Sequence, residues 1–188
     1  MTLLEQAHAG NRDAFTALVA RYQAPVFRYL RTLTRTPQEA EDALQQTFLA
    51  VWRSLLPDSG AGKRGEGSVR AWLFTIARHA AYRQGRRHAG EPDTLESLES
   101  LGERAGWGEP EDPERVAMLL EDRERLHAAL ARLSDDDREV ILLRDVEGLS
   151  GEDAARVLDL PLANLKTRLH RARLRLRAAL QQEVRHEG

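Results

Sequence analysis

Hydrophobic residues recur along this chain at steps of three and four positions, which is the period of an amphipathic helix. A first helix is predicted to begin after Asn11, and Pro25 is expected to kink or interrupt it. A second is predicted over residues 37–55, with Thr36 as its N-cap and Glu39 as its third residue, the spacing of a capping box. The pattern therefore indicates helices with locally encoded starts.

The next segment interrupts the helical period. Residues 57–68 contain four glycines and are predicted to form a loop. Ser68 is expected to cap a third helix, which buries Trp72 and Leu73 on one face. Its other face carries cations: Arg70, Arg78, Arg83, Arg86 and Arg87.

The last part of the chain contains a recognisable arrangement of helices. After Asp112-Pro113 a helix is predicted, followed by another that Ser134 caps and that ends at Gly148. Residues 151–158, a turn, and residues 162–180 then form a predicted helix-turn-helix.

Composition supports an all-α fold. Aromatic residues make up only 5% of the chain, while Ala, Leu, Arg and Glu are abundant. There is no cysteine, so disulfides and thiolate metal sites are excluded. No signal peptide and no apolar run of the ~18 residues that a membrane span needs is visible, and a cytoplasmic protein is expected.

Charge divides the chain into three parts. Residues 1–90 hold 13 Lys and Arg against 7 Asp and Glu, residues 91–137 hold 5 against 15, and residues 138–188 hold 10 against 8. Two small helical domains, 1–90 and 113–188, joined by a flexible acidic linker over 91–112, are therefore predicted. The linker is expected to contact the basic faces transiently, although its acids could equally serve only to keep it soluble and extended.

Two faces have the composition of interaction surfaces. The outer face of helix 37–55 shows Asp42, Gln45, Gln46 and Leu49. The third helix combines its arginines with Phe74, His79 and Tyr82, which are expected to be exposed; rings and cations together suit single-stranded nucleic acid. An ordinary solvated surface is the alternative for both.

The last predicted helix, residues 162–180, has the strongest sequence signal of DNA binding. Between Asn164 and Leu180 the chain has six cations and no acid, which is typical of a recognition helix in the major groove. A solvated basic helix is the alternative. The cations are Lys166, Arg168, Arg171, Arg173, Arg175 and Arg177.

Four segments in order carry a resemblance to a known family: EAEDALQQTF at 39–48, VRAWLFTIAR at 69–78, LLRDVEGLS at 142–150 and LKTRLHRAR at 165–173. Together they resemble the extracytoplasmic-function (ECF) sigma factors of bacterial RNA polymerase. The resemblance implies promoter-directed initiation, with core RNA polymerase, duplex minus-thirty-five DNA, melted minus-ten DNA and a cognate anti-sigma factor as partners.

The resemblance also implies residue roles. Asp42, Gln45, Gln46 and Leu49 would bind core polymerase, although Gln46 stands where an acid is common. The minus-ten element would be read by Arg70, Phe74, Arg78, His79, Tyr82 and Arg83, with a flipped base held by the glycine-rich loop. His79 stands where Asn is usual and Arg83 where Asp is frequent. The minus-thirty-five element would be read by Asn164, Lys166, Thr167, Arg168, His170, Arg171 and Arg175.

Two other functions are compatible with parts of the pattern. A stand-alone helix-turn-helix regulator would bind duplex DNA without polymerase. An enzyme acting on nucleic acid or phosphoesters is poorly supported, because none of the six histidines pairs with another at a spacing of four. No catalytic residue, cofactor or metal site is predicted.

Overall fold

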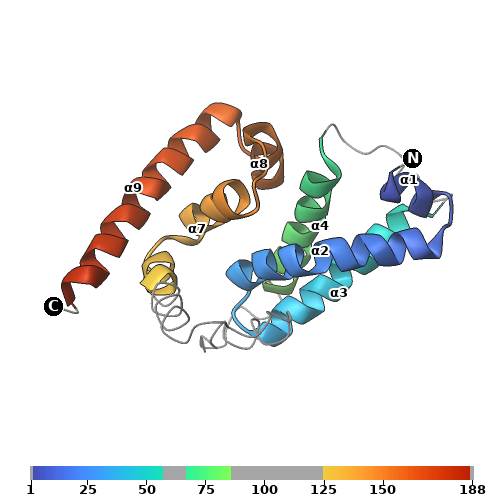
Figure 1. Ribbon diagram of the computed structural model, residues 1–188, viewed down its shortest axis with the longest axis horizontal. Helices are drawn as coiled ribbons and strands as arrows, with labels where there is room; N and C mark the ends of the chain where they lie inside the picture. The colour runs from blue at the N-terminus through green and yellow to red at the C-terminus, as the bar shows by residue number, and fades with distance from the viewer. Residues whose placement is uncertain (1, 57–66, 86–124, 187–188) are drawn as a thin grey trace, which may run out of the picture.

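A computed structural model describes residues 2–56, 67–85 and 125–186, and helices joined by short turns make up this part of the chain (Figure 1). None of its helices combines the length and the apolar character that crossing a membrane requires. The all-α fold predicted from composition and periodicity is confirmed.

Four helices form the N-terminal part: α1 (Leu3–His8), α2 (Arg12–Leu33), α3 (Pro37–Ser54) and α4 (Val69–Gly85). Helix α4 packs against both α2 and α3, and α1 packs against α2. A cluster of buried residues joins all four helices, including Leu4, Leu18, Val51 and Leu73. Helix α1 was not predicted, although Thr2 and Glu5 form a reciprocal capping box at its start.

Side chains at the helix starts satisfy backbone N–H groups that have no partner within the helix. Asn11 Oδ1 accepts from the N–H of Asp13 and Ala14, and Thr36 Oγ1 accepts from Glu39 N at 3.1 Å. Pro25 does not interrupt α2, which continues through it to Leu33, so that part of the expectation was wrong. Burial of Val26, Tyr29 and Leu30 directly after the proline favours continuation of the helix.

The C-terminal part is helical over residues 125–131 and continues through α7 (Asp135–Ile141), a π-helical turn η1 (Leu142–Val146), α8 (Gly151–Leu158) and α9 (Leu162–His186). Ser134 and Ser150 cap α7 and α8, as predicted. Gly148 lies at φ 63° after the π-helical turn.

A tight turn joins the last two helices. Asp159 adopts the left-handed conformation at φ 53°, and its N–H bonds to Arg156 O at 3.2 Å, which ends α8. Helix α9 then begins at Leu162 and packs against both α7 and α8. The predicted helix-turn-helix is therefore present.

The N-terminal and C-terminal parts pack directly against each other. Helix α4 contacts α8, and α2 contacts α7. Helices α7 and α8 therefore lie between α9 and the N-terminal part (Figure 1). One continuous cluster of buried residues extends from Tyr29 and Phe74 to Val140, Ala154 and Leu165. The hydrophobic pattern had not indicated this contact.

Candidate nucleic-acid interface

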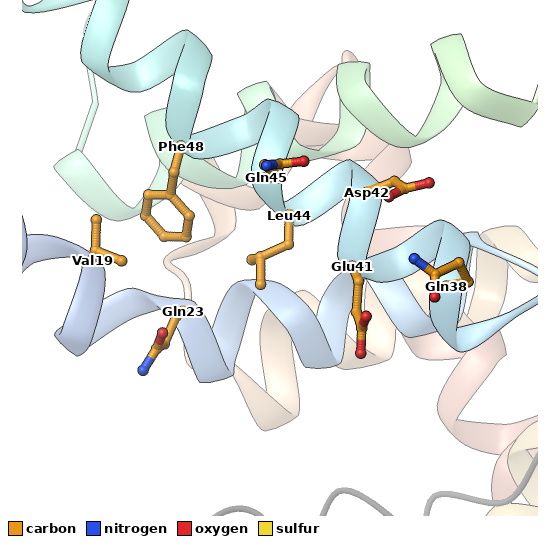
Figure 2. Close-up of a pocket in the computed structure, with 8 residues that line it drawn as sticks. All are labelled: Val19, Gln23, Gln38, Glu41, Asp42, Leu44, Gln45 and Phe48. Carbon is orange, nitrogen blue, oxygen red and sulfur yellow. The ribbon is translucent and has the colours of Figure 1, made fainter.

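A groove runs between α2 and α3 on the outside of the N-terminal part. Leu44 and Phe48 point from α3 toward α2, where Val19 faces Phe48 (Figure 2). Asp42 and Gln45, both exposed on α3, lie along the same groove with Glu41 and Gln38. The structure thus brings together two of the four residues predicted to form this surface.

The other two predicted residues lie on the same helix but outside the groove lining. Gln46 is exposed, and Leu49 is 41% exposed. Beneath them, Ala43, Thr47 and Val51 are buried, which fixes the outward direction of this face.

Helix α4 is buried on two sides. Leu73 is buried in the N-terminal cluster and Trp72 is half-buried against it, as the period predicted. Phe74 was expected to be exposed and is 0% exposed, so this expectation was wrong. Its ring makes an edge-on contact with Tyr29 of α2, with centroids 5.1 Å apart, and lies in the cluster that joins the two parts.

Three of the remaining predicted residues of α4 are exposed near its C-terminal end. His79, Tyr82 and Arg83 are exposed, and Arg83 Nε donates to His79 O at 3.2 Å. The guanidinium of Arg78 lies over the ring of Tyr82, 4.7 Å from its centroid. Cation and ring together form a small platform of the kind that stacks on bases.

Two buried carboxylates from the C-terminal part contact the arginines of the N-terminal part. Glu139 of α7 is 2% exposed, and its Oε1 accepts from Tyr29 Oη at 2.5 Å and from Arg78 Nε at 2.9 Å. Burial and the charge of Glu139 raise the pKa of Tyr29 well above its usual value, so the phenol remains a donor.

The second carboxylate belongs to Glu147, which follows η1 and is 1% exposed. It accepts from Arg28 Nε at 2.7 Å through Oε1 and from Arg70 Nη2 at 2.8 Å through Oε2. Sequence reasoning did not single out Glu139, Glu147, Tyr29 or Arg28.

A second apolar stripe on α4 is the signal that could have revealed this contact. Ala71, Phe74, Ala77 and Ala81 recur at steps of three and four positions and alternate with the arginines. A helix with two apolar stripes is expected to pack on two sides. Only the stripe that contains Leu73 was interpreted as buried.

Helix α9 presents its cations outward. Leu165, Leu169 and Ala172 are buried against the C-terminal core. The opposite face near the start of the helix consists of exposed residues: Asn164, Lys166, Thr167, His170 and Arg171. The exposure of this face agrees with the prediction.

Three arginines of α9 are ion-paired to acids of α7 and η1. Arg168 Nη1 lies 3.0 Å from Asp136 Oδ2, and Arg173 Nη2 lies 2.5 Å from Asp145 Oδ1. Arg175, a predicted reader of DNA, is paired with Asp137, which is 4% exposed. These pairs set the orientation of the recognition helix on the C-terminal part.

Some predicted features lie outside the described residues. They are most of the glycine-rich loop, Arg86 and Arg87, and the acidic linker at 91–112. The predicted contact of the linker with basic faces stays a prediction.

The fold and these surfaces define a two-part helical DNA-binding protein with a helix-turn-helix. Comparison with known proteins identifies its family. Residues 18–91 match the model of sigma-70 region 2, and residues 123–176 match the model of sigma-70 region 4. The RNA polymerase sigma-H factor of Pseudomonas aeruginosa is 31% identical over 183 residues, which cover 95% of this chain and 92% of the relative.

One more relative and two solved structures are similar to this chain. The RNA polymerase sigma factor CnrH of Cupriavidus metallidurans is 34% identical over 95% of this chain and 92% of its own length. The solved structure of CnrH in complex with the cytosolic domain of CnrY has a TM-score of 0.64 at 28% identity, covering 96% of both chains. That of RpoE from Bartonella quintana with the anti-sigma factor NepR has a TM-score of 0.63 at 24% identity, covering 89% of this chain and 96% of that one.

The chain belongs to the sigma-70 family and is an ECF-type RNA polymerase sigma factor. It is not an enzyme; it binds core RNA polymerase and promoter DNA, and directs initiation to specific promoters. The predicted family and function are confirmed, and the stand-alone regulator is set aside because both sigma regions match in order.

Proposed function

We propose that three surfaces of the chain divide the work of initiation: the groove between α2 and α3 binds core polymerase, the outer edge of α4 contacts the melted minus-ten strand, and α9 reads the minus-thirty-five element. The observation that carries this division is that α3 and α9 project these residues away from a buried stripe, while on α4 the exposed Tyr82 lies beside Arg78 and the exposed His79 beside Arg83. We place the two functional domains at residues 1–90 and 113–188, with 91–112 as the tether.

The polymerase surface combines an apolar floor with a polar rim. Leu44 and Phe48 supply the floor, and Asp42 with Gln45 supply charge and amide groups beside it. Such a groove suits a helix that carries one apolar stripe flanked by cations. We include Gln46 and Leu49 in this surface because both project from the same helix.

The test is a double substitution, Asp42→Arg with Gln45→Ala. It should abolish binding to core polymerase in an anisotropy assay and leave helicity unchanged, because neither side chain is part of the buried core. The control is Asp13→Arg, which makes the same charge change at an exposed residue of α2 outside the groove lining. Core affinity that is the same in the double variant and the control would contradict the assignment.

The minus-ten surface is formed by Arg70, Phe74, Arg78, His79, Tyr82 and Arg83. The Arg78–Tyr82 pair supports a role in holding unstacked bases, because it offers a ring face and a cation together. Phe74 would act from beneath, by supporting the edge that bears these residues.

The minus-thirty-five surface is formed by Asn164, Lys166, Thr167, Arg168, His170, Arg171 and Arg175. Residues at the start of a recognition helix are those that meet base edges, and here they include the exposed Lys166 and Arg171. Arg175 lies farther along the helix, a position that suits contact with a phosphate rather than a base, and its ion pair with Asp137 would have to be exchanged for that contact.

An anti-sigma factor is a further proposed partner. CnrH, which aligns with 95% of this chain, has been solved in complex with the cytosolic domain of CnrY. We also propose that the protein acts in the cytoplasm, where core polymerase and promoter DNA are found. Co-purification of the chain from its native cells, with identification of the bound proteins, tests for both polymerase and an anti-sigma factor.

A further inference from the structure

The contact between the two parts of the chain depends on two carboxylates whose partners lie across the boundary. Glu139 bonds to Tyr29 and Arg78, and Glu147 bonds to Arg28 and Arg70. All four partners belong to α2 or α4. The side-chain bonds of both acids thus run from the C-terminal part to the N-terminal part.

Glu139 and Glu147 are buried only while the two parts are packed together, which we call the closed arrangement. A buried carboxylate is stable only when it is paired and hydrogen-bonded, and each of these two has two donors. If the two parts separated, water would solvate both glutamates and all three arginines. Separation would therefore leave neither carboxylate buried without a partner, and its main cost would be exposure of the apolar cluster that includes Phe74 and Leu165.

The arginines remain accessible to competitors. The side chains of Arg28, Arg70 and Arg78 are 47%, 37% and 21% exposed, so solvent and salt screen their pairs. Within the described residues, Arg70 Nε is buried without an acceptor, so the carboxylate of Glu147 does not use every donor of that side chain. A ligand with more oxygen atoms would also accept a hydrogen bond from Arg70 Nε.

A phosphodiester is such a ligand. Guanidinium groups bind phosphate and carboxylate oxygens with the same paired geometry. Arg70 and Arg78 lie on the face of α4 that we assign to the minus-ten strand, and Arg28 lies beside Arg70 because both reach the same glutamate. The three arginines and the phenol of Tyr29 therefore form two neighbouring anion sites.

We propose that these two sites bind phosphates of the melted promoter strand, and that Glu139 and Glu147 occupy them in the free chain as internal competitors. The C-terminal part thus covers the minus-ten face until nucleic acid or polymerase displaces it. This inference rests on the proposed function of α4 and adds Arg28 and Tyr29 to its DNA-binding residues.

The test replaces both acids in the full chain, Glu139→Gln with Glu147→Gln. Because the substitutions free two partly exposed anion sites, the double variant should bind a fluorescein-labelled single strand of about 20 nucleotides roughly fivefold more tightly than the unsubstituted chain at low salt. The gap should close as salt rises. The matched control is Glu152→Gln with Asp159→Asn, which removes the same charge at two exposed residues of the C-terminal part. Equal affinity in the double variant and the control would overturn the proposal.

A second measurement uses the unaltered interface. The chain has no cysteine, so Ala24→Cys on α2 and Ala178→Cys on α9, both at exposed positions, accept a donor and an acceptor dye without background. Energy transfer should fall as the unlabelled strand saturates the protein, and the glutamine double variant should start from a lower value. Constant transfer at saturating DNA would overturn the proposal even if the double variant failed to fold.

Binding of core polymerase distinguishes failure of this inference from failure of the proposed function. A chain that binds polymerase but shows constant energy transfer refutes only the internal competition. A chain that does not bind polymerase at all refutes the proposed function, whatever the dyes report.

Discussion

The arginines of α9 cannot be told apart by their sequence pattern, but the structure gives them different surroundings. Arg171 is exposed near the start of the helix, where base edges would be met. Arg175 is paired with Asp137, whose carboxylate is almost fully buried. The first side chain is therefore available for recognition, while the second also stabilises the fold.

Two alanine substitutions distinguish these roles. Arg171→Ala should cost ~1–3 kcal/mol of binding at a cognate minus-thirty-five duplex, with no loss on a scrambled duplex and no loss of stability. Arg175→Ala should lower the free energy of unfolding by ~1–3 kcal/mol, because it leaves the buried Asp137 carboxylate without this donor. Urea denaturation and anisotropy on both duplexes measure these effects. Equal losses of Arg171→Ala on the two duplexes would refute its role in base reading.

At the scale of the element, the start of α3 shows how a helix is encoded locally. Thr36 Oγ1 accepts from Glu39 N, and Glu39 Oε2 accepts from Arg35 N at 2.8 Å. Burial alone would raise the pKa of Glu39, but hydrogen bonds from Arg35 and Thr36 and the charge of Arg35 lower it. The carboxylate is therefore stabilised in the folded chain.

This lowered pKa predicts a pH-dependent contribution to stability. Because the folded pKa lies below the unfolded one, the contribution is complete above the unfolded value near 4.5 and is lost as pH falls through the folded value. Glu39→Gln should cost ~0.5–1 kcal/mol at neutral pH and almost nothing at the acid end of that window. Urea denaturation of both proteins at the two pH values measures the difference. A cost that does not change with pH would contradict this origin.

Local signals of this kind explain why so much of the fold could be predicted. Thr36, Ser134 and Ser150 each mark a helix start through a bond that spans three residues, so no tertiary information is needed. The exposure of the outer face of α3 and of the start of α9 could be predicted from the recurrence of apolar residues at steps of three and four positions. Continuation of α2 through Pro25 depended instead on tertiary burial, which the local pattern does not contain.

The burial of Phe74 and the pairing of Glu139 could not be predicted in the same way. Glu139 meets Tyr29 and Arg78 across separations of 110 and 61 residues. Charge patterning indicated only that α4 is basic and would attract an anion. Which anion it contacts in the free chain depends on how the two parts pack.

At the scale of the whole molecule, two parts that must both bind promoter DNA are packed against each other. Helix α9 packs on α7 and α8, on their far side from the N-terminal part (Figure 1), while Arg70 and Arg78 of α4 pair with acids of the C-terminal part across the contact. Under the proposed assignments, minus-thirty-five recognition is compatible with this packing, whereas minus-ten recognition requires the two parts to separate. Promoter selection would then be completed only when polymerase has engaged the chain.

The central claim is that this chain gives core RNA polymerase its choice of promoter. The most direct measurement is a pull-down with purified core polymerase, followed by run-off transcription on genomic fragments. We expect stable co-purification and transcripts that start from a discrete set of fragments only when the chain is added. Failure to retain polymerase, or the same transcripts with and without the chain, would contradict it.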